Sequence, residues 1–277
     1  MKRFTRTDLA CEREDGSKRK EYELHGYRVC EVEQIRRNER ILYTAVHTGL
    51  LMQLDNAKRD RAAEAVATQL AHVSESLVGR PSCVLVACLG NPRITPDSLG
   101  PCVAKSLEVT RHVQLMDRAA FARFGKGSLC LVAPGVLGDT GVESAELVRG
   151  AVRELGTELV VAVDALAASS LSNLGSVVQI CDHGLQPGSG TGSRRPAIDR
   201  EEVGCPVISL GIPTVTDSAS MICDALSMAG ICGVGESLSK HLAHSKRYLV
   251  APGNVDELVQ VGAQLLASAI GRCFGIF

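Results

Sequence analysis

Short runs of apolar residues, each ended by an acidic loop or by a loop with glycine and proline, recur along this chain. The clearest runs cover residues 83–89, 129–134, 159–163 and 206–211. Runs of this length that are rich in Val and Leu are typical of strands buried on both faces of a parallel sheet. Helical patterns follow several of them. This alternation predicts the α/β class, with a mainly parallel, twisted sheet and helices on both faces.

The other elements are predicted from periodicity and from helix-start signals. Apolar residues recur at helical spacing from Asp55 to about Leu77 and again beyond Val255, which predicts two amphipathic helices. Thr95, Pro96 and Asp97 fit the N-cap, the first position and the first turn of another helix. Further helix starts are predicted at a capping box over residues 140–143 and at residues 213–217, further strands at residues 177–181 and 247–252, and a small β unit within residues 28–48.

The N-terminus is dense in charge and poor in apolar groups. Residues 1–20 are therefore predicted to form a mobile leader, which is a candidate for a short propeptide. This leader has no apolar segment that could serve as a secretory signal. At 277 residues the chain is long enough to bury a large core. We expect a single α/β domain over residues 21–277 that includes the small N-terminal β unit.

Composition excludes several classes of partner. The 30 basic and 31 acidic residues give a net charge of −1, so no overall field draws the chain to nucleic acid or anionic lipid. Aromatic residues make up only 3% and Trp is absent, which leaves no base-stacking platform. No apolar run approaches the length needed to cross a bilayer. The 11 cysteines contain no Cys-x-x-Cys pair, which favours reduced thiols in the cytoplasm. We expect neither a nucleic-acid nor a membrane partner.

Four aspartates lie at the carboxyl ends of predicted strands, where open α/β sheets place their ligand sites. They are Asp97, Asp164, Asp182 and Asp217. A lone acid in such a place usually caps a helix or forms a turn, and Asp182 and Asp217 could do no more than that. Several acids at one edge suggest more, because two close carboxylates can share a proton. Such a pair can activate water as a base and protonate a leaving amine as an acid.

Other chemistries have weaker support in the sequence. No Gly-x-Ser-x-Gly motif indicates a serine hydrolase of the elbow type. The glycine-rich residues 187–192 lack the spacing of a dinucleotide-binding loop, so we expect no cofactor. His241 and His244 lack a third metal ligand and are read as surface residues, whereas His183 is the one histidine near the predicted cleft. Arg194 and Arg195 are either a solvated pair or a clamp for a negatively charged substrate segment.

An ordered set of motifs resembles the bacterial spore germination protease family. The motifs are RTDLA (residues 6–10), LGN (89–91), TPDSLGP (95–101), PGV (134–136), TGVE (140–143), VDALAA (163–168), PGSG (187–190) and IPTV (212–215). Each motif is weak alone, but the set follows the family's order from residue 6 to the C-terminal helix.

This resemblance implies an endopeptidase that degrades small acid-soluble spore proteins when a spore germinates, located in the forespore and the spore core. It also implies a homotetramer and a zymogen that removes its own N-terminal leader. The family is regarded as an atypical aspartic-type protease, and its two proposed catalytic acids match Asp97 and Asp164. We expect the substrate to be held by the glycine-rich loop and the residues before it, which are Asp182, His183, Gly188, Ser189 and Gly190.

Two departures from the family pattern bear on specificity and processing. The usual Asp-Thr-Gly-Ile before the PGSG motif is replaced here by residues 182–185, DHGL, and the usual Asn after it is Ser193. We therefore expect a different specificity near this loop. Five residues precede Arg6, so the expected leader is shorter than in relatives.

Two alternatives remain open at this level. The resemblance implies a fold shared with hydrogenase-maturation peptidases, which use metal-binding acids and a histidine, so a metal-dependent peptidase is one alternative. A catalytically silent relative that binds spore proteins is the other.

Overall fold

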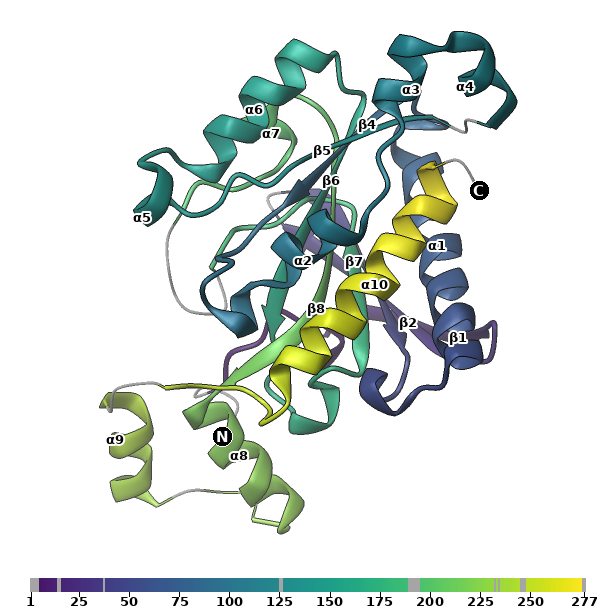
Figure 1. Cartoon of the computed structure of the whole chain (residues 1–277). Helices are drawn as coiled ribbons and strands as arrows, with labels where there is room; N and C mark the ends of the chain where they lie inside the picture. The colour runs from purple at the N-terminus through teal and green to yellow at the C-terminus, as the bar shows by residue number, and fades with distance from the viewer. Residues whose placement is uncertain are drawn as a thin grey trace.

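The computed structural model describes residues 5–13, 16–36, 38–124, 127–188, 195–231, 233, 235–244 and 248–275. A mixed sheet of nine strands forms the centre of the molecule, and helices cover both of its faces (Figure 1). Eight of its strands follow the order β1-β2-β3-β7-β8-β6-β4-β5, and β9 (Leu249–Val250) pairs with the end of β8. The predicted α/β class is confirmed.

The parallel half of the sheet contains the apolar runs that the sequence singles out. Its strands are β4 (Cys83–Cys88), β5 (Ser128–Val132), β6 (Leu159–Ala167) and β8 (Val207–Asp217). They lie in the order β5-β4-β6-β8, and every neighbouring pair among them is parallel. Their carboxyl ends therefore meet at one edge, as the Asp97 and Asp164 argument requires.

The other half of the sheet is antiparallel. It contains β1 (Lys18–Leu24), β2 (Tyr27–Arg36), β3 (Glu39–His47) and β7 (Val177–Cys181). The predicted N-terminal β unit is thus present and joins the main sheet through β3 and β7. Only residues 168–176, with the short turn η5 (Leu171–Asn173), connect β6 to β7. This connection is shorter than the dozen or more residues that a parallel crossover needs, so β7 runs antiparallel to β8.

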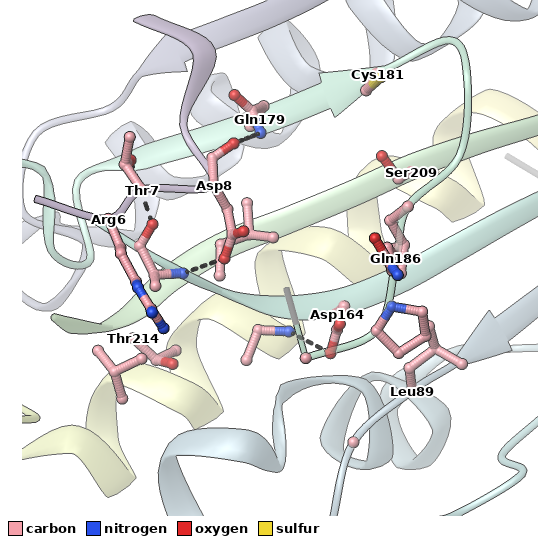
Figure 2. A pocket seen from close by; sticks show the side chains of 18 of the residues that line it. Arg6, Thr7, Asp8, Leu89, Asp164, Gln179, Cys181, Gln186, Ser209 and Thr214 are labelled. Carbon is pink, nitrogen blue, oxygen red and sulfur yellow. Dashed lines mark hydrogen bonds between the residues drawn. The ribbon is translucent and has the colours of Figure 1, made fainter. Parts of the chain in front are cut away.

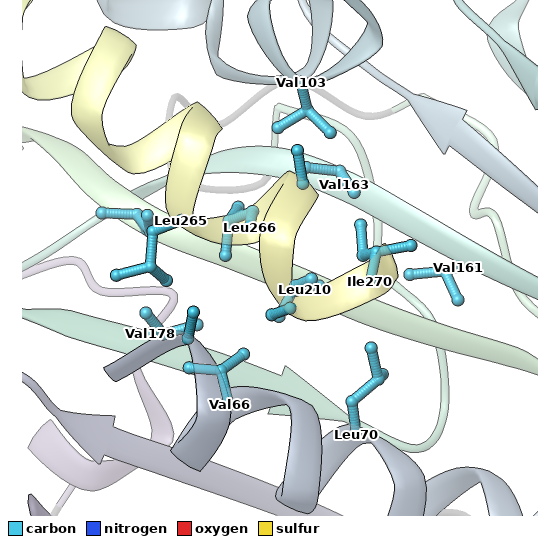
Figure 3. Packing of buried hydrophobic residues seen from close by; sticks show 14 of the residues in the cluster. Val66, Leu70, Val103, Val161, Val163, Val178, Leu210, Leu265, Leu266 and Ile270 are labelled. Atoms are coloured by element: carbon cyan, nitrogen blue, oxygen red, sulfur yellow. The ribbon is translucent and has the colours of Figure 1, made fainter. Parts of the chain in front are cut away.

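One face of the sheet is covered by α1 (Asn56–Val78), α2 (Leu99–Ser106) and α10 (Val255–Phe274). Figure 3 shows side chains of α1 and α10, such as Leu70 and Ile270, meeting those of Val161 and Leu210 on the sheet. The opposite face packs on α6 (Ser144–Leu155) and α7 (Arg200–Val203) through a second cluster that includes Val160. Neighbouring residues of β6 thus point to opposite cores, which explains why the strand is continuously apolar.

The remaining helices lie away from these layers. The segment between α2 and β5 forms α3 (Arg111–Met116) and α4 (Arg118–Phe124), and α5 (Leu137–Thr140) follows β5. The helices α8 (Ser218–Met228) and α9 (Glu236–His244) project from one end of the sheet (Figure 1). No helix in the described ranges is long and apolar enough to cross a membrane.

Three predicted helix starts are displaced. The predicted capping box over residues 140–143 is wrong, because α6 begins at Ser144 and its reciprocal cap joins Glu143 and Glu146. Residues 95–97 form only the 3₁₀ turn η4 (Thr95–Asp97), and α2 begins at Leu99. The helix predicted from residues 213–217 begins later, at Ser218, because β8 continues through Asp217.

The prediction of a mobile leader is wrong for residues 5–13, which pack on the sheet. Leu9 and Ala10 are fully buried in a small cluster with residues of β2, β3 and β7, and the turn η2 (Ala10–Glu12) begins at Ala10. β1 begins inside the predicted leader, at Lys18. The apolar pair at Leu9 and Ala10 outweighs the surrounding charges, because it is buried against the face of the antiparallel half, on residues of β2, β3 and β7.

Candidate active site

A large open cavity of about 1860 Å³ lies beyond the carboxyl ends of β4 and β6. Its walls come from the N-terminal segment, the loop after β4, the end of β6 and the loop after β7. Asp97 and Asp164 both line it, although 67 positions separate them in the sequence. The sheet thus brings the two predicted catalytic acids to one cavity.

Asp164 is the more buried of the two acids. It lies on β6 opposite Gly211 of β8, with 8% of its surface exposed, and its Oδ1 accepts the Ala165 N–H at 2.9 Å (Figure 2). Burial, followed by the charges of Asp97 and Asp8, raises its pKa from 3.8 to about 8. The Ala165 N–H and the charge of Arg195 oppose that rise. Asp164 is therefore protonated over most of the neutral range.

Asp97 is held by a tight loop. The Asn91 N–H is shared between Oδ2 of Asp97, at 2.9 Å, and its carbonyl oxygen, at 3.1 Å. Gly90 is required there, because it has φ +115° and a Cβ would lie 2.0 Å from the Asp97 carbonyl oxygen. Thr214 of β8 donates to the Pro96 carbonyl at 2.7 Å and ties the turn to the sheet. The Gly90-Asn91 and Thr95-Pro96-Asp97 motifs thus form one structural unit.

Burial also raises the pKa of Asp97, whereas the Asn91 N–H and the charge of Arg195 lower it. Asp97 is less buried than Asp164, so less of its surface lies away from the water that stabilises a carboxylate. The two acids therefore differ in the way that an acid and base pair requires.

A third acid, Asp8, reaches the cavity from the N-terminal segment. The Asp8 N–H donates to the Ala167 carbonyl, and its Oδ2 accepts the Ala167 N–H, both at 2.9 Å. Its charge contributes to the raised pKa of Asp164. Sequence reasoning did not assign Asp8 to the site, because the charge-rich N-terminus predicted a mobile leader. The RTDLA motif was the signal that could have pointed to it.

The other two strand-end acids do not join the cavity. Asp182 exchanges hydrogen bonds with Leu42 through its Oδ1 and its N–H, which extends the β3–β7 pairing. Burial raises its pKa, and the Leu42 N–H opposes that rise. Asp217 caps α8 by accepting from the N–H groups of Ala219 and Ser220. Both acids thus have the capping and pairing roles that a lone acid usually has.

The predicted substrate loop is partly described. His183 and Gly188 line the cavity, and Nδ1 of His183 lies 3.8 Å from Oε2 of Glu39. Arg195 also lines the cavity. Ser189, Gly190 and Arg194 lie outside the described residues. Over the ranges that the structure describes, no group of three or more His, Cys, Asp and Glu side chains is arranged to hold a metal ion.

The family model and two relatives that match this chain are germination proteases. The family model for germination protease matches residues 14–256. A germination protease of Clostridium acetobutylicum is 36% identical over 220 residues, which cover 72% of this chain and 67% of that protein. A germination protease of Bacillus licheniformis is 31% identical over 242 residues, covering 80% of this chain and 66% of that protein.

Other comparisons concern the length of the relatives and a solved structure. The chain spans 56% and 50% of the lengths of germination proteases from Caldanaerobacter subterraneus and Oceanobacillus iheyensis. A crystal structure of the [NiFe] hydrogenase maturation protease HycI from Thermococcus kodakarensis matches 72% of this chain and 98% of that chain, at 16% identity and a TM-score of 0.38. Because the family model extends from the N-terminal strands to the start of α10, the chain belongs to the germination protease family.

Proposed function

We propose that this chain is an endopeptidase that degrades small acid-soluble spore proteins during spore germination, with Asp97 and Asp164 as its catalytic acids. The observation that carries the proposal is the meeting of these two acids in one cavity of a chain from this family. The burial of Asp164, which raises its pKa to about 8 while Asp97 is less buried, adds support to the proposal.

The two acids take complementary roles in this mechanism. Asp97, as a carboxylate, accepts a proton from a water molecule that attacks the substrate carbonyl carbon. Asp164, protonated at neutral pH, donates a proton toward the carbonyl oxygen or the leaving amine. Because Asp164 must carry its proton, activity falls as the pH rises through about 8.

Substrate contacts are proposed for the loop after β7. His183 and Gly188 line the cavity and can meet a substrate chain directly, and Ser189 and Gly190 follow them in the sequence as further proposed contacts. Asp182 supports this loop through its two hydrogen bonds to Leu42. The histidine at position 183 differs from the residue usual in the family, so substrate preference near this loop would differ as well.

The proposal includes self-processing, a homotetramer and a location in the forespore and spore core. Residues 5–8 line the same cavity as the two acids, so the leader lies within reach of the proposed chemistry. Several large apolar side chains are exposed and could be covered by other copies of the chain, among them Met116 and Met228.

The first prediction is that Asp97→Asn and Asp164→Asn each lower cleavage of a purified small acid-soluble spore protein by at least about 10²-fold, because each removes one partner in proton transfer. Product formation is followed by mass spectrometry, and thermal unfolding shows whether each variant is folded. Asp139→Asn is the matched control, since this carboxylate is paired with Arg93 and does not line the cavity. Two folded variants that cut at the native rate would refute the assignment.

Two rival activities are separated in the same assay. Metal-dependent hydrolysis requires that dialysis against a chelator removes activity and that added metal restores it. A catalytically silent relative would bind the spore protein without cutting it at any pH between 5 and 8.

A further inference from the structure

Gln179 on β7 is buried, with 6% of its surface exposed, and its side chain faces the cavity (Figure 2). Its Nε2 donates to the Asp8 carbonyl at 2.9 Å, and its Oε1 accepts the Ala10 N–H at 2.7 Å. Both partners are main-chain groups, and Leu9 lies between them in an extended conformation. The amide of Gln179 thus holds the main chain on both sides of the extended Leu9, much as a neighbouring strand would.

Residues 8–10 lie between the end of β6 and Gln179, and we call the path that they occupy the track. The Asp8 N–H donates to the Ala167 carbonyl at 2.9 Å, so the segment is paired on one side with β6 and on the other with Gln179. The segment lies near the acid pair, since Asp8 lines the same cavity as Asp97 and Asp164. A carboxamide offers one acceptor and donors on the same side chain, so it can hold a peptide main chain without selecting its side chains.

We propose that Gln179 is a positioning residue that holds the main chain of an extended peptide substrate through the same two hydrogen bonds that now hold residues 8 and 10. This inference rests on the proposed endopeptidase function and specifies where its substrate lies. A substrate chain displaces the N-terminal segment from the track and presents a main-chain carbonyl and an N–H group two residues apart to Gln179.

The competing interpretation is that Gln179 only fastens the chain's own N-terminal segment. Comparing the affinity of one peptide for the two chains would not separate the two interpretations, because Gln179→Met weakens the binding of both the chain's own N-terminal segment and the added peptide. A probe that differs by a single N–H group does separate them, since the resident segment competes equally with both probes.

The test uses two fluorescent peptides with the sequence of residues 5–13, one native and one with an ester in place of the amide that carries the Ala10 N–H. Their binding is measured by anisotropy to the Asp97→Asn chain, which the proposed mechanism leaves unable to cut them, with and without Gln179→Met. With Gln179 present, the amide peptide should bind about fivefold more tightly than the ester, as expected for one neutral hydrogen bond. With Gln179→Met, the two peptides should bind within about twofold of each other.

An equal amide preference in both chains would overturn the inference. Gln69→Met is the matched control, since Gln69 is 4% exposed, accepts from Tyr22 and does not line the cavity, so it should leave the fivefold preference intact. If Gln179→Met does not fold, Gln179→Asn shortens the same amide by one methylene and should show the same loss of preference.

The outcomes of this test and of the proposed function are distinct. If the native chain never cuts spore protein but its preference for the amide peptide depends on Gln179, the peptide-binding site is supported and the proposed protease function is refuted. If the native chain cuts spore protein but its preference for the amide peptide does not depend on Gln179, the protease function is supported and the proposed role of Gln179 is refuted. If the resident segment blocks both peptides, Glu12→Gln is added to both chains to weaken the segment's second anchor, at Ser169 and Ser170.

Discussion

Asp164 links the pH to the stability of the fold. Its pKa is about 8 in the folded chain against the ordinary 3.8, so folding favours the protonated form. The stabilising contribution of that form is complete below about pH 4 and is lost as the pH rises through 8. This group therefore lowers the free energy of unfolding in alkaline solution relative to acidic solution.

We therefore expect Asp164→Asn to be more stable than the native chain at pH 8, by about 2–5 kcal/mol, and equal to it near pH 4. The variant keeps an oxygen that can accept the Ala165 N–H but cannot ionise. Urea unfolding at pH 4, 6 and 8 measures the difference. Asp139→Asn should show no such trend beyond about 1 kcal/mol. A difference that does not grow with pH would contradict the assignment of Asp164 as a buried, protonated acid.

At this scale, the strand-end rule selects candidates but does not decide among them. Of the four aspartates it selects, Asp97 and Asp164 line the cavity, whereas Asp182 and Asp217 are used in pairing and capping. The local sequence does not separate the two groups. Asp182 ends a strand that runs antiparallel to β8, whereas Asp217 ends β8 itself, well beyond Gly211, the partner of Asp164. Gln179 could not be selected either, since a polar residue within an apolar strand has no partner in the sequence alone.

The N-terminal segment is an element in its own right, although it contains only a short turn. Its second anchor is Glu12, whose carboxylate accepts from the Ser169 N–H at 2.7 Å, the Ser169 hydroxyl at 2.8 Å, the Ser170 N–H at 3.0 Å and Asn173 Nδ2 at 2.8 Å. Thr7 also donates to it. Hydrogen bonds to a charged group contribute more than neutral ones.

Replacing this carboxylate should release the segment. We expect Glu12→Gln to lower the free energy of unfolding by about 2–3 kcal/mol, because the new amide places a donor against groups that donate. Hydrogen exchange should show lost protection at Leu9 and Ala10. Glu23→Gln, at an exposed position on β1, should leave both measurements unchanged. Retained protection in Glu12→Gln would show that the segment is held by its buried apolar pair alone.

Helices and strands were predicted well where the spacing of apolar residues determines them. Strand directions and helix starts that depend on the connecting segments were predicted less well. The α1 helix and the strands of the parallel half follow from the spacing of Val, Leu and Ala. The direction of β7 follows instead from the short connection that precedes it. The start of α6 was misplaced because the sequence offers two overlapping capping patterns, one from Thr140 to Glu143 and one from Glu143 to Glu146. Only the backbone shows that Thr140 is the last residue of α5 and that Glu143 caps α6.

The whole molecule exposes large apolar side chains at separate places. Met116 is 85% exposed on α3, Met228 is 81% exposed on α8, and Tyr248 is 65% exposed next to β9. A homotetramer would cover some of these groups, which would otherwise remain in water.

We expect size-exclusion chromatography with light scattering to give the mass of four 29.4 kDa chains. Met116→Asp and Met228→Asp place a charge on the two exposed helices, and the variant whose methionine lies in an interface should yield smaller species. The mass of a single chain at every concentration tested would contradict the tetramer.

Residues 5–13 belong to the same chain as the cavity and precede β1 in the sequence, so this peptide is always near the site. A short tether of this kind corresponds to an effective molarity in the millimolar range. A free peptide of the same intrinsic affinity must exceed that effective molarity before it occupies half of the sites, so apparent affinities measured with the intact chain will understate the intrinsic ones. A ligand search is therefore more sensitive with Glu12→Gln than with the native chain.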